Sequence, residues 1–391
     1  MISGYGRTVE RRSWLSRASE SPLRRLDWAL ICVTVVLSAI GAVLVFSATR
    51  VGLTDAGDDP YSYLKKHLFN LVIGLVLGGV TAALDYRLLR AYAPILYAAA
   101  CVGLVTVLTP LGATINGSHS WILLGGGFAV QPSEFAKVGL LLIIAMLLAQ
   151  PAEGTDRPRT LDIVLALIAA SITMGLVMLQ PDLGTALVLA VITAAGLVIA
   201  GVRKRWIAGL TVVAGLGVFS VFYFQLLEPY QVARFTAFVD PSVDPRGVGY
   251  NSTQSLIAIG SGQLMGKGLL GGGQTTGRFV PEQHTDFIFT VAGEEFGFLG
   301  SVTVVLLLGV VLLRGLKIAR QCEDRFGSLV AGTIVCWFAF QTFINVGMTI
   351  GIMPITGLPL PFVSYGGTAT FANLIAIGLL QAIRVRRQSF N

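Results

Sequence analysis

The chain has 391 residues, of which 54% are hydrophobic and only 13% are charged, and its mean hydropathy is +0.75. Such a composition leaves too little polar surface to cover a soluble globule of this size, so it indicates a membrane protein. The net charge of +7 does not indicate nucleic-acid binding, because the basic residues are scattered between apolar runs. No C-x-x-C spacing links the four cysteines, so neither a disulfide framework nor a zinc site is indicated for Cys32, Cys101, Cys322 and Cys336.

Taken in chain order, the apolar runs predict an all-α, polytopic membrane protein. Residues 1–25 are Arg-rich and contain no apolar segment before a small-residue cleavage site, so we expect a cytoplasmic tail and no cleaved signal peptide. A single membrane domain, 26–385, and a short cytoplasmic C-terminus, 386–391, follow. One span needs roughly 20 apolar residues. That length gives about ten candidates, 28–48, 67–84, 91–109, 135–150, 161–179, 184–201, 206–226, 285–313, 328–351 and 368–384.

The lysines and arginines predict the orientation of the spans. With the N-terminus inside, 20 of the 28 basic residues fall on the cytoplasmic side, which is the expected positive-inside bias. We therefore expect a multi-pass membrane protein with both termini in the cytoplasm. On this topology the segments 110–134 and 227–285 face outward.

The connection between the seventh and eighth spans, 227–285, is the longest in the chain. Long connections in compact proteins are usually functional or disordered. This one contains an apolar helical patch, Leu256–Ile259, and then a glycine-dense run, 260–277, which permits close backbone approach to a ligand. A flexible linker is the alternative interpretation.

The fourth span begins with a cluster of polar residues in the sequence QPSEFAK. Pro132 after Gln131 suits the first turn of a helix, and Glu134 and Lys137 are three residues apart on one helical face. Charges at a membrane-embedded helix start are costly unless they are paired or face a wet cavity. Lys137 is thus either a phosphate-binding cation or part of an interfacial pair that anchors the helix by snorkelling.

A second polar cluster, PEQHTDFIFTVAGEEFG, opens the eighth span. His284, Asp286, Glu294 and Glu295 lie within twelve residues, next to an apolar run. A low-dielectric cleft would raise the pKa of a carboxylate and make it a usable base. The alternative role for Asp286 is to cap the N-terminus of the helix.

Four motifs together resemble the RodA/FtsW/SpoVE (SEDS) family of bacterial cell-wall polymerases: QPSEFAK, QPDLGTA, PEQHTDFIFTVAGEEFGFLG and LPLPFVSYGGTATFANLIAIGLL. The match follows the family's order over nearly the whole chain. It implies ten spans and a peptidoglycan glycosyltransferase that polymerises lipid II into β-1,4 glycan strands on the outer face of the bacterial cytoplasmic membrane. Within the family, Leu26–Arg50 and the short basic C-terminus look more like the elongation (RodA) branch than the division (FtsW) branch.

The resemblance also implies roles for individual residues. The family's catalytic aspartate maps to Asp286, its outer-loop tryptophan to Trp121, and its acid and lysine to Glu134 and Lys137. His284 and Ser364, within the matched motifs, are further candidate contacts for substrate. The implied partners are lipid II, membrane lipids and a class B penicillin-binding protein as transpeptidase.

The chemistry agrees with these residue types. A diphosphate leaves without a general acid, so the site needs one base for the acceptor hydroxyl and positive charge for the diphosphate. Asp286 would be the base. Lys137, Arg234, Arg278 or a divalent cation, Mg or Mn, would supply the charge. Inversion in a single displacement predicts no covalent enzyme intermediate. A lipid II flippase and a scaffold without activity are the alternatives, which the charges at the outer face and the acid cluster disfavour.

Overall fold

The computed structural model describes residues 22–115, 118–125, 128–224, 232, 234, 236–238, 240 and 247–386. Most of the predicted N-terminal tail, residues 387–391 of the C-terminus and much of 225–246 in the long connection lie outside the described residues.

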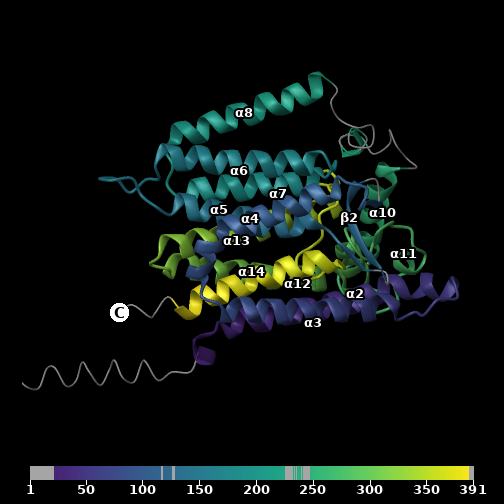
Figure 1. Ribbon diagram of the computed structural model, residues 1–391. Helices are drawn as coiled ribbons and strands as arrows, with labels where there is room; N and C mark the ends of the chain where they lie inside the picture. Colours follow the sequence, from purple (N-terminus) through teal and green to yellow (C-terminus); the bar gives the residue numbers. More distant parts are fainter. Residues whose placement is uncertain are drawn as a thin grey trace, which may run out of the picture.

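The described residues form ten helices of 17 residues or more (Figure 1), and each coincides with one predicted span. The all-α, polytopic architecture is therefore confirmed. By length and composition, seven of the ten could cross a membrane. The ten helices are α2 (Trp28–Asp55), α3 (Ser62–Ala83), α4 (Tyr86–Val107), α5 (Pro132–Leu148), α6 (Thr160–Met178), α7 (Leu183–Ile199), α8 (Lys204–Tyr223), α12 (Ile288–Gln321), α13 (Arg325–Thr349) and α14 (Gly367–Arg386).

Helix α5 is the centre of the bundle. It contacts α4, α6, α7, α13 and α14, and its residues from Gly139 to Ala145 are all buried. A helix that is apolar on all sides is stable when other helices surround it. This explains why the fourth span can be only 17 residues long. Its first residue is Pro132, as predicted, because the missing N–H of proline costs nothing in the first turn.

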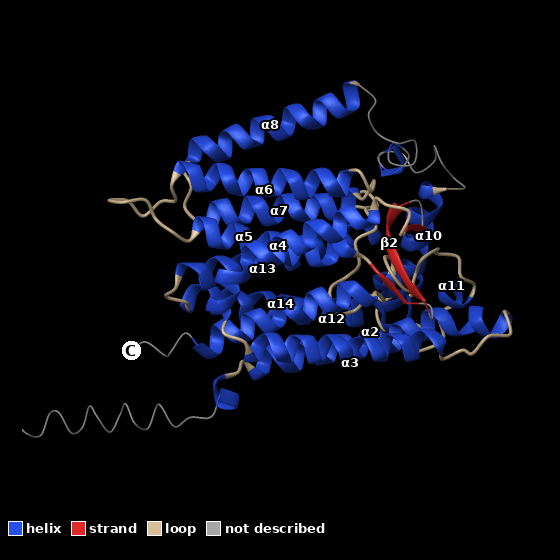
Figure 2. Ribbon diagram, viewed as in Figure 1, coloured by secondary structure: helices blue, strands red, loops and turns tan. Residues whose placement is uncertain are grey.

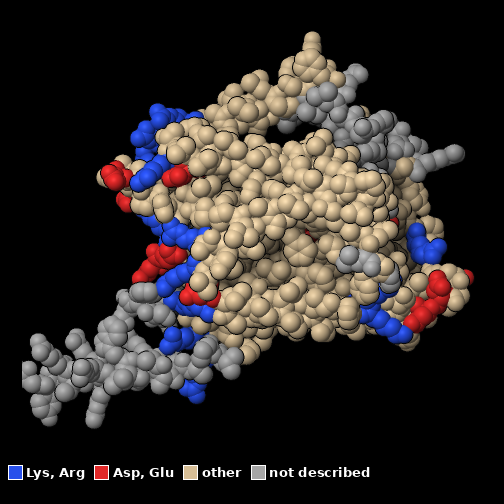
Figure 3. Space-filling model, in the orientation of Figure 1, with Lys and Arg blue, Asp and Glu red and all other residues tan. Residues whose placement is uncertain are grey.

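One end of the bundle holds the two ends of the described chain. Asp27 caps α2 and is 3% exposed, and its carboxylate binds Arg314 of α12 through contacts of 2.7 to 3.1 Å. The backbone N–H of Asp27 donates to Gln381 Oε1 of α14 at 2.9 Å. Figure 3 shows most of the visible Lys and Arg side chains at this end, which we call the basic end, and an uncharged band across the middle.

The opposite end carries the described parts of the segments 110–134 and 227–285 (Figures 1 and 2). The segment 110–134, which the sequence indicated only as a loop, contains an antiparallel sheet in the order β1 (Gly112–Ile115), β2 (Ser118–Gly125), β3 (Phe128–Val130). The long connection contributes α10 (Val248–Ser261), which includes the predicted apolar patch, and the short α11 (Gly273–Thr276). From residue 247 onward it is thus folded, and it is not a flexible linker there.

The long connection forms backbone hydrogen bonds with α12 at a point where that helix is interrupted. Gly297 has φ 67° and interrupts the helix, and the N–H groups of Phe298 and Leu299 donate to the carbonyls of Gln263 and Leu264 at 2.9 and 3.2 Å. Gly266, with φ 80°, lies so close to the carbonyl of Glu295 that a Cβ would clash with it. The glycine-dense run was expected to approach a ligand, but here its close approach is to the protein's own helix.

Candidate active site

Asp286 lies in the turn that precedes α12, at the end of the bundle opposite the basic end. The helix starts at Ile288 with Phe287 as its N-cap, and no side chain caps it. The capping role considered for Asp286 is therefore wrong. Its backbone is held in place instead, because Asn345 Nδ2 of α13 donates to the carbonyl of Asp286 at 2.8 Å and to that of Leu358 at 2.7 Å.

The carboxylate of Asp286 lies close enough to Arg234 to be affected by its positive charge. A Cβ at Gly357, which has φ 76°, would lie 3.4 Å from Asp286 Oδ2 and 3.9 Å from Arg234 Nη1, so both side chains lie beside this glycine. Arg234 Nη1 also donates to the carbonyl of Thr356 at 3.3 Å. The sequence analysis named Asp286 and Arg234 separately, and the structure brings them together.

The surroundings of Asp286 favour its protonated form. Burial, followed by the nearby negative charge of Glu282, raises the pKa of Asp286 to about 7, and Asp182 adds to this effect while Arg234 opposes it. A carboxylate with a pKa near 7 suits general-base catalysis at neutral pH, since it is substantially ionised and still basic enough to take a proton.

Asp182 is a site residue that sequence reasoning did not assign, although the motif QPDLGTA contains it. It caps α7 by accepting hydrogen bonds from Thr185 N at 2.9 Å and Thr185 Oγ1 at 2.7 Å. Gln131 Nε2, just before α5, donates to Asp182 Oδ2 at 3.1 Å. Asp182 thus links the starts of α5 and α7. The sequence feature that could have pointed to Asp182 is a carboxylate next to a proline at the start of an apolar span.

His284 belongs to an aromatic cluster beside the turn. Its ring lies 4.9 Å from the ring of Tyr63 and 5.6 Å from that of Tyr365, and its carbonyl accepts from the N–H of Tyr365 at 3.0 Å. Burial lowers the pKa of His284, although Glu282 acts against this. Ser364 is 5% exposed, and its Oγ accepts from Leu360 N at 2.8 Å, so its hydroxyl oxygen is already used within the protein.

Glu134 and Lys137 form the predicted pair on α5. Their side chains are 3% and 0% exposed, the ion-pair distance is 2.7 Å, and Lys137 Nζ lies 5.1 Å from the centre of the Trp337 ring. The snorkelling alternative is wrong, because the ammonium group is fully buried and does not reach an interface.

Trp121 and Arg278 lie in other parts of the end opposite the basic end. Trp121 is half-buried in β2, opposite Ala113 of β1. Arg278 is an exposed residue whose side chain covers Gly52 in the last turns of α2. Within the described part of the chain, no three or more His, Cys, Asp or Glu residues come together as a group that could hold a metal ion.

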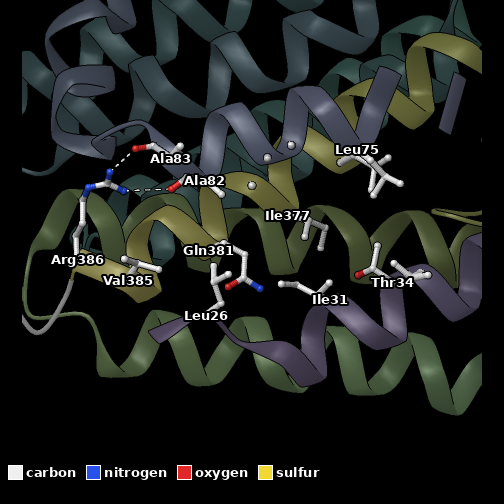
Figure 4. A pocket seen from close by; sticks show the side chains of 15 residues that line it. Leu26, Ile31, Thr34, Leu75, Ala82, Ala83, Ile377, Gln381, Val385 and Arg386 are labelled. Atoms are coloured by element: carbon white, nitrogen blue, oxygen red, sulfur yellow. Dashed lines mark hydrogen bonds between the residues drawn. The ribbon is translucent and has the colours of Figure 1, made fainter. Parts of the chain in front are cut away.

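An apolar groove of about 540 Å³ lies at the basic end, between α2, α3 and α14 (Figure 4). Arg386 closes one end of it and donates to the carbonyls of Ala82 and Ala83. Its position at the other end of the bundle separates it from Asp286.

Comparison with known proteins identifies the family. Residues 27–389 match the model of the FtsW, RodA and SpoVE family, described as cell cycle protein. A probable peptidoglycan glycosyltransferase FtsW of Trichlorobacter lovleyi is 36% identical over 361 residues, which cover 92% of this chain and 93% of that protein.

Two solved structures have the same fold. A peptidoglycan synthase complex that coordinates polymerization and crosslinking contains a chain that matches with a TM-score of 0.76 and 31% identity, over 93% of this chain and 98% of that one. The rod shape determining protein RodA of Thermus thermophilus matches with a TM-score of 0.67 and 29% identity, over the same 93% and 98%. With its family model matched over nearly the whole length, the chain belongs to the FtsW/RodA/SpoVE family.

Proposed function

We propose that this peptidoglycan glycosyltransferase polymerises lipid II at the end of the bundle that holds Asp286, with Asp286 as the general base. The observation that carries the proposal is the half-buried carboxylate of Asp286, with a pKa raised to about 7, next to the guanidinium of Arg234. Base and positive charge are the two groups that a sugar transfer with a diphosphate leaving group requires.

In the proposed reaction, Asp286 removes the proton from the acceptor hydroxyl as that oxygen attacks the anomeric carbon of the donor. The bond to the diphosphate breaks in the same displacement, which inverts an α-linked donor to a β-1,4 product without a covalent enzyme intermediate. The positive charge of Arg234 acts on Asp286, and its guanidinium can bind phosphate oxygens in a bidentate manner.

Lys137 has a different part in the proposal. Its charge is balanced by Glu134 at 2.7 Å, so direct binding of the diphosphate would first require the pair to open. We therefore assign the pair to holding the start of α5. A divalent cation, Mg or Mn, stays in the proposal as an ion carried by the diphosphate, because such cations usually need only one or two protein carboxylates.

The orientation and cellular role belong to the same proposal. We place the Asp286 end outside the membrane and both termini in the cytoplasm, on the positive-inside bias. Polyprenyl tails would lie in lipid-facing grooves between helices. The sequence of Leu26–Arg50 and the basic C-terminus support the elongation branch. The relative at 36% identity is instead named FtsW, the name of the division branch. Complementation of elongation-deficient and division-deficient strains distinguishes the branches.

The proposed partner is a class B penicillin-binding protein. The solved complex that coordinates polymerization and crosslinking contains a chain of this fold, and a strand polymerase needs a separate crosslinking activity. The test is a polymerisation assay with the purified chain, its partner and lipid II, in which glycan strands form and are resolved by length. Transfer of lipid II across vesicle membranes without strand formation would instead support a flippase.

A further inference from the structure

Glu294 is a buried acid whose carboxylate accepts five hydrogen bonds, and the proposed reaction does not use it. It lies in the second turn of α12 with its side chain 0% exposed. Its Oε1 accepts from Lys267 Nζ at 2.9 Å, Gln274 N at 2.9 Å and Ser261 Oγ at 3.3 Å. Its Oε2 accepts from the N–H and the hydroxyl of Thr275, both at 2.8 Å.

A carboxylate has about four lone-pair positions, so these five contacts leave none of them without a donor. A buried charge is tolerated only when it is paired and hydrogen-bonded in this way. All five donors come from residues 261–275 of the outer connection, so Glu294 fixes that segment to α12. The backbone agrees, because Lys267 N donates to the carbonyl of Glu294 at 3.0 Å.

The fixed segment is connected to the turn that carries Asp286. Gln283 is 5% exposed, and its Nε2 donates to the carbonyls of Thr275 and Ala48, both at 2.9 Å. Both hydrogens of the amide group therefore donate hydrogen bonds, one to the segment that Glu294 holds and one to α2. Gln283 precedes Asp286 by three residues in a single compact turn, in which the N–H groups of Thr285 and Phe287 donate to the carbonyl of Glu282.

We propose that Glu294 is a positioning residue for the transfer reaction: it holds Thr275, Thr275 holds Gln283, and Gln283 sets the place of the Asp286 carboxylate. This inference rests on the proposed function of Asp286 as base. A base displaced by about 1 Å can lose about a hundredfold in rate. Loosening this connection therefore lowers kcat while leaving the binding of lipid II nearly unchanged.

The first test compares two adjacent threonines in the full chain, assayed with its transpeptidase partner and lipid II. Thr275→Val removes the hydroxyl that donates to Glu294, whereas Thr276→Val removes a hydroxyl that donates to the carbonyl of Gly272 at 2.8 Å. We expect Thr275→Val to lower kcat about tenfold with KM within about twofold of the parent, and Thr276→Val to keep parent kinetics. Equal kinetics in the two variants would overturn the inference.

The second test asks whether Glu294 acts through Gln283. Glu294→Gln and Gln283→Leu are each expected to lower kcat by about ten- to a hundredfold, and the double variant by no more than the larger single effect, because both break one connection. Purely additive losses, or parent kcat in folded Gln283→Leu, would contradict the proposal. If Glu294→Gln does not fold, the kcat values of Thr275→Val, Thr276→Val and Gln283→Leu test the positioning role without it.

Failure of this inference is distinguishable from failure of the proposed function. An inactive Asp286→Asn together with a fully active Gln283→Leu would reject only the positioning role. An active Asp286→Asn would reject the base itself.

Discussion

Replacing Asp286 by Asn tests the base with the smallest change in shape. Asn cannot accept the proton of the acceptor hydroxyl, so we expect polymerisation to fall by about 10²- to 10⁴-fold, the usual contribution of general-base catalysis. The backbone carbonyl that Asn345 holds at 2.8 Å is unchanged by this substitution. We therefore expect the variant to insert and to bind its partner as the parent does.

The same substitution has a predictable effect on stability. Burial raises the pKa of Asp286 from 3.8 to about 7. At about 1.36 kcal/mol per unit, ionising Asp286 in the folded protein costs at most about 4 kcal/mol. Because the folded pKa is raised, the protein is most stable below pH 4 with respect to this group, and that stability is lost as the pH rises through about 7. Asp286→Asn avoids the cost, so its melting temperature should equal or exceed that of the parent at pH 8.

Two measurements test this reasoning. Strand formation from lipid II should rise with pH up to about 7 in the parent and then level off, because only the ionised carboxylate is a base. Thermal melting of parent and variant at pH 5 and pH 8 gives the stability difference. Near-parent polymer from well-folded Asp286→Asn, or a rate independent of pH between 5 and 8, would refute the assignment and direct attention to Glu282 and Asp182.

Three further predictions follow from other parts of the structure. If Trp121 stacks on a substrate sugar, Trp121→Ala should reduce polymer formation more than Trp121→Phe at equal expression, whereas equal activities would indicate a membrane-interface role. In a cysteine-free background, Gly273→Cys should react with an impermeant thiol reagent from outside intact cells and Glu323→Cys should not; equal labelling would contradict the orientation. Asp27→Asn should lower stability by about 3 kcal/mol, because it leaves Arg314 without its charge partner, and should spare the kinetics of the purified protein.

The sequence predicted the helices well because membrane spans depend on a local property. Each span needs a run of apolar residues long enough to cross the bilayer, and such runs are visible without knowledge of contacts. The pair of Glu134 and Lys137 was predictable for the same reason, since residues three apart in a helix are neighbours. The sheet from Gly112 to Val130 was missed because β1 and β3 are only four and three residues long and the alternation of polar and apolar residues in this segment is weak.

The arrangement around the candidate site was less predictable, because it depends on pairs that are distant in the chain. Nothing local joins Asn345 to the carbonyl of Asp286, or Lys267 to Glu294, which are 59 and 27 residues apart. The sequence showed three acids near the start of the eighth span but not which of them was free. The structure separates them by their partners: Glu294 accepts from five donors and Glu295 accepts from the hydroxyl of Ser47, whereas Asp286 lies beside Gly357 within the influence of the charge of Arg234.

That separation explains how one short segment supports two carboxylates with different roles. Both lie within nine residues, from Asp286 to Glu294, so composition alone would give them similar chemistry. The N–H and hydroxyl donors of Thr275, together with Lys267, stabilise the ionised form of Glu294 and make it a structural anion. Burial and the charge of Glu282 disfavour the ionised form of Asp286 and make it basic. A carboxylate whose oxygens all accept hydrogen bonds is stable as an anion and can hold two segments together. A carboxylate whose ionised form is disfavoured by burial binds a proton more readily, which is the property that a general base needs.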